Sequence, residues 1–512
     1  MSKNRARLLL VTTLLLAASL ACQTITQAFT VETDRLTPAA SPTSVGGQSG
    51  NDGPVNTPLA EEASPDNPQP GAAGFGDPYY PNFGNGGYDA LHYIIVLDAE
   101  IGPNTITAEV TMQAAALEDL TSLNLDFVGL EVDRVAVDGV EAQYKRSGGE
   151  LTIYLPAPLS AGEAISVSVA YHGTPGRGVD LSSRPEYEIG WGHYGEGVYI
   201  AGEPGGASSW YPVNEHPSDK ATYEYHITVD DPNVVGANGL LQETIPAGDG
   251  ETTYVWASVH PMGSYLTTLA IGEFDLETSQ SPEGVLIRNY FEESIAQSSR
   301  NEFDVTGEML DYFASLFGPY PFEAYGVAVH DTPLGFALET QTLSVFGSWF
   351  INEEVIAHEL AHMWFGDSVT LATWQDIWLN EGFATYASWL WYEHAYGDGI
   401  MDDIVNDYYD VMASFPHQPP ADPGADNLFS DTVYTRGALA LHALRLEVGE
   451  DSFFDILYTY HETYKYGNAS TADFMAVAQA VSGQDLGDFF QAWLYETELP
   501  DIPQLGLSAD DF

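Results

Sequence analysis

The sequence of 512 residues contains a single cysteine, Cys22. One thiol cannot form a disulfide within the chain, so stability has to come from a buried apolar core. The composition can supply such a core, because 44% of the residues are hydrophobic and 12% are aromatic. The chain is long enough for two or three domains, and a largely disordered protein is excluded.

Basic residues are also scarce. Fifteen lysines and arginines stand against 74 acidic residues, which gives a formal net charge of −59. A surface of this charge repels anions, so no nucleic acid is expected as a partner. A solvated acidic surface accounts for the excess, and both a saline habitat and an exposed extracellular life are consistent with it.

The first hydrophobic run is too short to span a bilayer. It extends from Leu8 to Ala21 and follows the basic residues Lys3, Arg5 and Arg7. A basic segment followed by an apolar run of this length is typical of a secretory signal peptide. We therefore expect residues 1–21 to be a signal peptide and the protein to be exported.

A possible lipid attachment site follows the apolar run. The residues Ser19, Leu20 and Ala21 before Cys22 resemble a bacterial lipobox, although Ser19 stands where Leu is usual. The resemblance implies that Cys22 becomes a lipidated N-terminus and that a lipid anchor is the protein's only contact with the membrane. The alternative is an ordinary cleavage site near Ala21 with an incidental thiol.

An H-E-x-x-H motif carries the strongest chemical signal. His358 and His362 lie four residues apart on a predicted helix over 352–365, so both imidazoles face one point. Glu381 follows in a predicted second helix. Two imidazoles and one carboxylate suit zinc and leave a fourth position for water. We therefore predict one catalytic zinc ion held by His358, His362 and Glu381, with Glu359 as the general base.

The second helix makes the third ligand credible. A helix over 374–396 would place apolar residues toward the core, with Glu381 as a lone acid among buried neighbours. By itself, an H-E-x-x-H motif also arises as two surface histidines beside a solvated glutamate. Zinc lowers the pKa of bound water and polarises a carbonyl group, which are the two effects that amide hydrolysis needs.

The pattern along the chain predicts a multidomain α+β protein. Residues 22–76 are rich in Pro, Gly and Ser and predict a disordered tether. Short runs with period-two alternation predict an antiparallel β domain over 77–275. Helical patterns then predict a mainly helical catalytic domain over 276–500, with one short strand pair before the first metal-site helix and a tail over 501–512.

From about residue 88 to 500 the chain resembles the zinc aminopeptidases that include aminopeptidase N. These are gluzincins with a thermolysin-like catalytic domain. The motifs that carry the resemblance are Y-D-A-L-H-Y at 88–93, W-Y-P at 210–212, P-S-D-K-A-T-Y at 217–223 and W-L-N-E-G-F-A at 378–384.

The resemblance implies further site residues. Glu339 lies in a degraded form of the family's G-x-M-E-N motif, whose glutamate binds the substrate's free α-ammonium group in the family. Glu203 matches a position that carries Gln or Glu in the family and assists in this binding. Tyr434 matches the catalytic tyrosine of a Y-x-K-G motif, with Arg436 in place of lysine. The implied function is an extracellular zinc aminopeptidase acting on peptides with a free N-terminus.

Two departures keep alternatives open. Phe336 and Thr340 replace Gly and Asn around Glu339, which changes the expected wall of the first side-chain pocket. The chain stops at Phe512 without the helical C-terminal domain that caps the cavity of larger members, so we expect an open cleft or one covered by a partner subunit. The alternatives are a zinc endopeptidase and a non-catalytic surface binding protein, and the oligomeric state stays undetermined.

Overall fold

The computed structural model describes residues 69–176, 189–195, 197–397 and 399–509. These residues belong to one compact unit that begins at Pro68. The predicted signal peptide, Cys22 and most of the predicted tether lie outside the described residues.

The predicted tether extends too far toward the C-terminus. Gln69–Pro70 form strand β1, which pairs in parallel with β4 (Leu120–Asp126). The next amide, that of Gly71, donates to the carbonyl oxygen of Ser122 at 2.9 Å. Residues 69–76 therefore belong to the folded unit. Their Pro and Gly content is typical of a linker, but an edge strand tolerates it as well.

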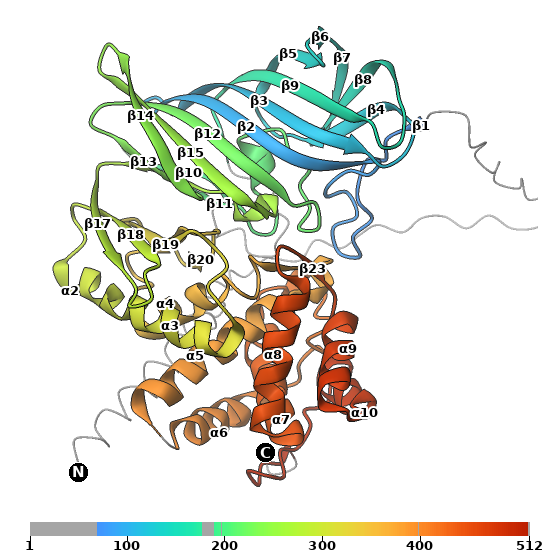
Figure 1. Cartoon of the computed structure of the whole chain (residues 1–512), viewed down its shortest axis with the longest axis vertical. Coiled ribbons are helices and arrows are strands. Elements are labelled where there is room, and N and C mark those ends of the chain that lie inside the picture. Colours follow the sequence, from blue (N-terminus) through green and yellow to red (C-terminus); the bar gives the residue numbers. More distant parts are fainter. Residues whose placement is uncertain (1–68, 177–188, 196, 398, 510–512) are drawn as a thin grey trace, which may run out of the picture. The chain divides into compact units, whose positions relative to one another are not determined.

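The largest sheet of the N-terminal part has eight strands (Figure 1). In sheet order these are β14 (Leu240–Gly248), β15 (Glu251–Met262), β12 (Ala221–Asp230), β2 (Tyr88–Glu100), β3 (Thr105–Ala116), β9 (Ala164–Gly173), β5 (Glu131–Val137) and β6 (Val140–Glu141). The part is rich in β-strands, as predicted, but β12 and β2 run parallel, so the sheet is not purely antiparallel. Along β2, Tyr93, Ile95 and Leu97 are buried because alternate side chains face the core.

Two four-stranded sheets complete this part. One consists of β1, β4, β8 (Glu150–Leu159) and β7 (Gln143–Ser147). The other consists of β10 (Gly190–Tyr194), β11 (Gly197–Ala201), β16 (Leu269–Gly272) and β13 (Val234–Ala237). Strand β11 is buried throughout and leads directly to Glu203.

A five-stranded sheet follows where a single strand pair was predicted. Its strands in order are β17 (Phe274–Gln280), β18 (Leu286–Glu292), β19 (Ala324–His330), β21 (Ser344–Gly347) and β20 (Ala337–Leu338). The strands β18, β19 and β21 are parallel, and the predicted boundary at residue 275 falls inside β17. Strands β19 and β21 are completely buried, so they lack the alternation by which half-buried strands are recognised.

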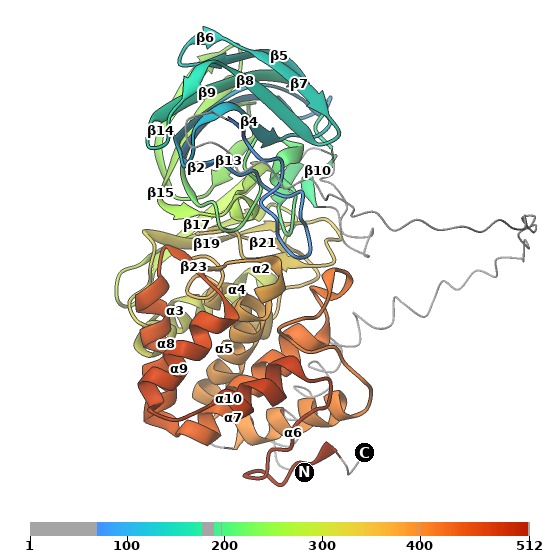
Figure 2. The same cartoon turned by 90° about the vertical axis from the view of Figure 1, so that its right-hand side faces the viewer.

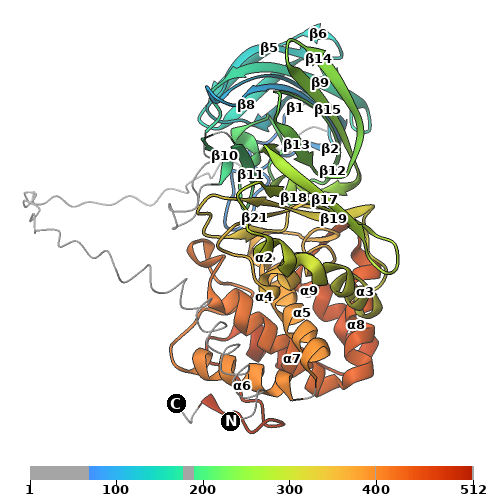
Figure 3. The same cartoon turned by 90° about the vertical axis from the view of Figure 1, so that its left-hand side faces the viewer.

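Helices make up most of the remaining chain. They are α2 (Gln297–Arg300), α3 (Thr306–Phe317), α4 (Glu353–Ala361), α5 (Trp378–Tyr396), α6 (Ile400–Ala413), α7 (Gly437–Val448), α8 (Glu450–Tyr464), α9 (Thr471–Ser482) and α10 (Gly487–Phe490). A small parallel pair, β22 (Val369–Leu371) and β23 (Gly467–Ala469), joins distant segments. Figures 2 and 3 show the five-stranded sheet between these helices and the N-terminal sheets. Among the helices that the structure describes, none has the length and apolar character of a membrane-spanning helix.

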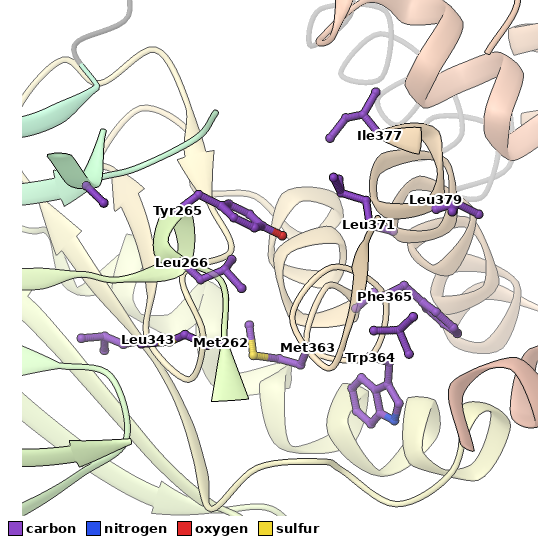
Figure 4. Close-up of a cluster of buried hydrophobic side chains, with 14 of the residues drawn as sticks. Met262, Tyr265, Leu266, Leu343, Met363, Trp364, Phe365, Leu371, Ile377 and Leu379 are labelled. Carbon is purple, nitrogen blue, oxygen red and sulfur yellow. The ribbon is translucent and has the colours of Figure 1, made fainter. Parts of the chain in front are cut away.

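One hydrophobic cluster runs through both parts of the folded unit. Figure 4 shows a portion in which Met262, Tyr265 and Leu266, at the end of the β-rich part, lie near Met363 and Trp364, just after α4. The predicted tail also contributes, because Ile502 is buried and pairs with Leu507. The helices that carry the predicted zinc ligands, α4 and α5, therefore pack on a core that both parts share.

Candidate active site

The N-terminus of helix α4 is capped by a side chain. The side chain of Asn352 accepts a hydrogen bond from the amide of Val355 at 3.1 Å and caps the helix. Glu353 and Glu354 occupy the first turn, where acidic side chains interact favourably with the helix dipole. The helix is thus fixed about one turn before His358.

Helix α4 ends earlier than the predicted span of 352–365. His362 is its C-cap residue and keeps right-handed helical dihedral angles, so its side chain remains on the same face as His358. The chain then turns: the amide of Asp367 donates to the carbonyl oxygen of His362 at 3.0 Å. Gly366 takes a φ of +138° in this turn, a value that side chains other than glycine rarely tolerate.

Helix α5 carries Glu381 in its first turn. It begins at Trp378 after a short 3-10 turn, Trp374–Asp376, rather than as one continuous helix over 374–396. Its residues from Trp378 to Tyr392 are all buried, because α5 is packed on every side. The apolar residues expected to face the core are all buried: Ile377, Trp378, Phe383, Ala384, Ala387 and Leu390.

The three predicted zinc ligands meet at one point. The Nε2 atom of His358 lies 3.2 Å from Oε2 of Glu381, and Nε2 of His362 lies 3.5 Å from the same oxygen. The two Nε2 atoms are 3.1 Å apart. One donor atom from each residue therefore lies within 4.8 Å of the others, as ligands of one ion do.

The hydrogen bonds around the histidines suit a zinc ion. The carbonyl oxygen of Phe365 lies 3.0 Å from Nδ1 of His362, so Nδ1 carries the proton and Nε2 offers its lone pair. The hydroxyl of Thr385 lies 3.5 Å from Nδ1 of His358 and can do the same there. Two nitrogen donors and one carboxylate oxygen, with the nitrogens oriented in this way, fit zinc.

Electrostatics within the site favour a cation. Burial opposes ionisation of Glu381, but His362 and His358 outweigh it and hold its pKa at about 2. Burial would lower the pKa of His362, whereas Glu339 and Glu381 raise it well above its usual value. The carboxylate of Glu381 is therefore ionised and ready to serve as a ligand.

Glu359 lies beside the ligands, directly after His358 in the chain. Its side chain is buried, and Oε2 has no hydrogen-bond partner among the described residues. Burial raises its pKa well above the ordinary value; His362 opposes the shift, and Glu339 and Glu381 add to it. A raised pKa makes the carboxylate of Glu359 a stronger proton acceptor than an exposed glutamate.

Glu381 is not the lone buried acid that the sequence suggested. Oxygens of Glu203, Glu339 and Glu381 lie within 4.8 Å of one another, although the three residues come from different parts of the chain. Atom Oε1 of Glu203 and Oε1 of Glu339 are buried and have no hydrogen-bond partner among the described residues. Burial and the neighbouring carboxylates raise the pKa of Glu203, and burial is also the main cause of the raised pKa of Glu339.

Tyr434 also lies at the site. It belongs to a π-helical turn, Thr432–Arg436, and its ring stacks on that of His358 with centroids 5.8 Å apart and an interplanar angle of 18°. The turn approaches α5 closely, since a Cβ added to Gly382 would lie 3.0 Å from the Cα of Gly437. Both glycines belong to the sequence motifs that contain Glu381 and Tyr434, so the motifs also encode this packing.

Arg436 anchors the same turn from inside the protein. The residue is completely buried, and its guanidinium donates to five backbone carbonyls of the segment that follows α10. The acceptors are the oxygens of Trp493 (3.2 Å), Thr497 (3.2 Å), Ala492 (3.1 Å), Glu496 (2.6 Å) and Glu498 (2.9 Å). The sequence marked Arg436 only as a departure from lysine. Three of these carbonyls face Nη2 and one each faces Nε and Nη1. Arginine has five N–H donors in a planar group with which to reach them, whereas a lysine has three.

The two substitutions around Glu339 have internal partners. The hydroxyl of Thr340 donates to the carbonyl oxygen of Leu343 at 2.5 Å. The ring of Phe336 packs against that of Tyr199, with centroids 6.4 Å apart. That these residues shape a substrate pocket stays a prediction.

Sequence reasoning missed several residues around the ligands. Thr385 was not singled out, although it lies one helical turn after Glu381. Tyr265 and Lys220 come from the β-rich part, and their partners lie more than one hundred positions away. No local spacing pattern could have linked them to the site. Lys220 appeared only as a letter in the 217–223 motif.

Comparison with known proteins agrees with this geometry. The model of the peptidase family M1 domain matches residues 301–493, and that of the peptidase M1 N-terminal domain matches residues 89–266. An M1 zinc metallopeptidase from Deinococcus radiodurans is 32% identical, with a TM-score of 0.79, over 84% of this chain and 98% of its own. A mutant two-domain M1 zinc metallopeptidase bound to L-arginine is 31% identical, with a TM-score of 0.79, over 84% of this chain and 99% of its own.

Curated relatives are longer. Probable aminopeptidase 1 of Saccharolobus solfataricus is 27% identical over 416 residues, which cover 74% of this chain and 50% of that protein. Aminopeptidase N of Oryctolagus cuniculus is 29% identical over 333 residues, which cover 57% of this chain and 34% of that protein. The chain thus spans half or less of the length of these two relatives.

A β-rich domain, a helical domain and a His-His-Glu site together define the zinc metallopeptidase class. Its cofactor is a single zinc ion. The chain belongs to peptidase family M1. The predicted family, α+β fold class and cofactor are confirmed.

Proposed function

We propose that this protein is a zinc-dependent aminopeptidase that removes N-terminal amino acids from peptides. The observation that carries the proposal is the pair of buried carboxylate oxygens of Glu203 and Glu339 beside the ligand cluster, which have no hydrogen-bond partner among the described residues; the oxygen of Glu339 lies 3.9 Å from Nδ1 of His362. A buried carboxylate without a partner is costly, and a substrate ammonium group would compensate the charge of both. An aminopeptidase needs a binding site for the substrate's ammonium group next to its zinc ion, because the scissile bond is one residue from the N-terminus.

His358, His362 and Glu381 would hold the zinc ion. When bound, zinc polarises a carbonyl group and lowers the pKa of water to roughly 7. Glu359 would accept a proton from the attacking water and deliver it to the leaving amine. Its raised pKa and its unpartnered Oε2 atom support both transfers.

Tyr434 would stabilise the negative charge that develops on the carbonyl oxygen. The stacking of its ring on that of His358, a zinc ligand, supports this role. A donor aimed at a developing oxyanion contributes roughly 2.7 to 4 kcal/mol to transition-state stabilisation in other hydrolases. Arg436 and the Gly382–Gly437 contact support the turn that carries this tyrosine.

Peptides are the proposed substrates. A mutant M1 zinc metallopeptidase from Deinococcus radiodurans, 31% identical to this chain, has been crystallised with a Tyr-Ser-Ala substrate. Short peptides with a free N-terminus are therefore suitable first reporters.

The deciding experiment compares a tripeptide with its N-acetylated form. Acetylation removes the ammonium group but leaves the scissile bond intact. We expect rapid hydrolysis of the free peptide and at least a hundredfold slower hydrolysis of the acetylated one. A factor on the order of one hundred corresponds to the free energy lost when one partner of a buried charged contact is removed. Equal rates would instead identify an endopeptidase, and no hydrolysis of either by the zinc-loaded protein would favour a binding protein.

We also propose that the protein is exported and held at the cell envelope or cell surface by lipid on Cys22. The basic residues before Leu8, the short apolar run and the lipobox-like residues before Cys22 support the proposal. The Pro- and Gly-rich residues up to about 68 would then hold the enzyme away from the membrane.

A further inference from the structure

We propose that Tyr265, a residue of the β-rich part, is a positioning residue for the zinc site. Its hydroxyl connects the turn that follows His362 to the segment that carries Glu381. The inference rests on the assignment of these two residues as zinc ligands, and it gives the N-terminal domain a part in setting the ligand geometry.

The hydroxyl of Tyr265 makes two hydrogen bonds. It donates to the carbonyl oxygen of Gly366 at 3.1 Å and accepts from Nδ2 of Asn380 at 3.3 Å. Asn380 directly precedes Glu381 in the chain. One hydroxyl therefore spans both ligand-bearing segments.

The first of these bonds acts close to His362. Gly366 follows Phe365, whose carbonyl oxygen accepts from Nδ1 of His362 at 3.0 Å. The carbonyl oxygen of Phe365 thus accepts from the imidazole of His362, and the next carbonyl oxygen, that of Gly366, accepts from Tyr265. A shift of this peptide unit would rotate the imidazole and move its Nε2 atom.

Gly366 allows this close arrangement. A Cβ built on it would lie 3.0 Å from Nδ1 of His362 and 3.6 Å from Nδ2 of Asn380. The backbone of residue 366, the imidazole of His362 and the amide of Asn380 therefore lie so close together that a side chain at position 366 would push them apart. The positive φ of Gly366 directs its carbonyl group within the same turn.

The ring of Tyr265 is held so that its hydroxyl reaches across the domain junction. The residue lies in the 3-10 turn Ser264–Leu266, is only 1% exposed, and meets the ring of Trp374 edge-on with centroids 5.3 Å apart. Figure 4 shows the hydroxyl directed from this turn toward the helices. Burial, with Glu339 and Glu203, raises the pKa of Tyr265 well above its usual value, so the hydroxyl keeps the proton that it donates.

Lys220 contacts the same turn at the residues that follow Gly366. Its Nζ atom donates to the carbonyl oxygens of Asp367 at 2.8 Å, Ser368 at 3.1 Å and Gly467 at 3.2 Å. The turn after α4 is thus attached to the β-rich part at consecutive residues, 366 to 368. These attachments add to the turn's own hydrogen bonds, in which the amides of Asp367 and Ser368 donate to the carbonyl oxygens of His362 and Met363.

The substitution Tyr265→Phe tests the proposal because it removes only the hydroxyl and keeps the ring contact with Trp374. We expect the zinc dissociation constant, measured by competition with a chromophoric chelator, to rise about tenfold, the lower end of the range for residues that orient metal ligands. The kcat of the zinc-saturated variant should fall, whereas KM for a free-amine peptide stays close to that of the wild type. The visible spectrum of the cobalt-substituted variant should also change, since it reports ligand geometry.

Tyr88→Phe is the matched control. Tyr88 is 1% exposed, as Tyr265 is, and its hydroxyl donates to the carbonyl oxygen of Asn124 at 2.7 Å, within the N-terminal sheets. This variant loses the same hydroxyl group from the same kind of environment. Its zinc affinity and cobalt spectrum should match those of the wild type.

The proposal is overturned if Tyr265→Phe binds zinc with wild-type affinity, or if Tyr88→Phe loses as much affinity as Tyr265→Phe. A wrong ligand assignment gives a different result, because the wild-type protein itself would then fail to bind zinc in the same titration.

Discussion

Carboxyl groups dominate the site at the scale of single residues. Glu203, Glu339, Glu359, Glu381 and Asp367 are all at most 7% exposed, and the two carboxylate oxygens of Asp367 have no hydrogen-bond partner among the described residues. Burying several negative charges together is strongly unfavourable unless cations balance them. Under the proposed function, a zinc ion and a substrate ammonium group would supply such cations. The raised pKa values of Glu203, Glu339 and Glu359 have the same origin, because burial beside other carboxylates disfavours the charged form.

Glu359→Gln should separate metal binding from turnover. The amide keeps the size of the side chain and leaves His358, His362 and Glu381 untouched, so zinc content should equal that of the wild type. Loss of the proton-transferring carboxylate should lower kcat by about 10²- to 10⁴-fold. Zinc analysis and kcat with an aminoacyl reporter check this, and Glu308→Gln, an exposed glutamate on α3, serves as the control. A fully active Glu359→Gln enzyme would refute the assigned mechanism.

At the scale of elements, a contact between two glycines positions Tyr434. Helix α5 and the start of α7 touch backbone to backbone at Gly382 and Gly437, and the π-helical turn before Gly437 presents Tyr434 to His358. Close approach of this kind is available only to residues without a side chain. The hydroxyl's placement therefore depends on helix packing as well as on the tyrosine itself.

Gly437→Ala should disturb this packing. The added Cβ would lie 3.0 Å from the Cα of Gly382, so α5 and α7 would have to separate. We expect a loss of about 1–3 kcal/mol in the free energy of unfolding, as for other overpacked sites, together with a lower kcat. Urea denaturation and steady-state kinetics measure the two effects.

Gly307→Ala in α3 is the control for that substitution. Its Cβ would meet neighbours at 3.4 Å or more, an ordinary contact distance. Alanine is the better helix former, so stability should stay the same or rise by up to about 1 kcal/mol. A similar loss in both variants would mean that the Gly382–Gly437 contact has no special role.

At the scale of the whole molecule, the metal should matter more for activity than for folding. The hydrophobic cluster runs through both parts of the folded unit and does not depend on the ligand residues. Chelation should therefore abolish peptidase activity while the far-UV circular dichroism spectrum is retained, and the melting temperature should fall modestly because a bound ligand is lost. Zinc should restore activity, whereas magnesium should not, since it prefers oxygen ligands. Unfolding on chelation would contradict this expectation.

The proposed lipid anchor is also tested on the whole molecule. Expression of the full-length chain in a bacterial host should place the wild-type protein in the membrane fraction. Cys22→Ser should release it to the soluble fraction with unchanged kcat, since residue 22 lies outside the folded unit. Metabolic labelling with a radioactive fatty acid should mark the wild type alone. Labelling of the Cys22→Ser protein would exclude this cysteine as the attachment site.

The sequence by itself determined the chemistry of the site. Spacing within helices is a local property, so His358, Glu359 and His362 could be assigned to one helix face, and the motifs could be matched residue by residue for Glu381 and the family. Alternation along half-buried strands likewise predicted the β-rich part. Burial on both faces removed this signal from β19 and β21, and the Pro- and Gly-rich composition of residues 69–76 concealed β1.

Only the tertiary structure decided how distant residues meet. It ended α4 at Ala361, brought Glu203 and Glu339 to Glu381, and placed Tyr265 between Gly366 and Asn380. These contacts join residues far apart in the chain, and their geometry follows from how sheets and helices pack around a shared core. The zinc-binding motif is therefore a feature of the sequence, whereas the support and the charge environment that make it a site arise from the fold.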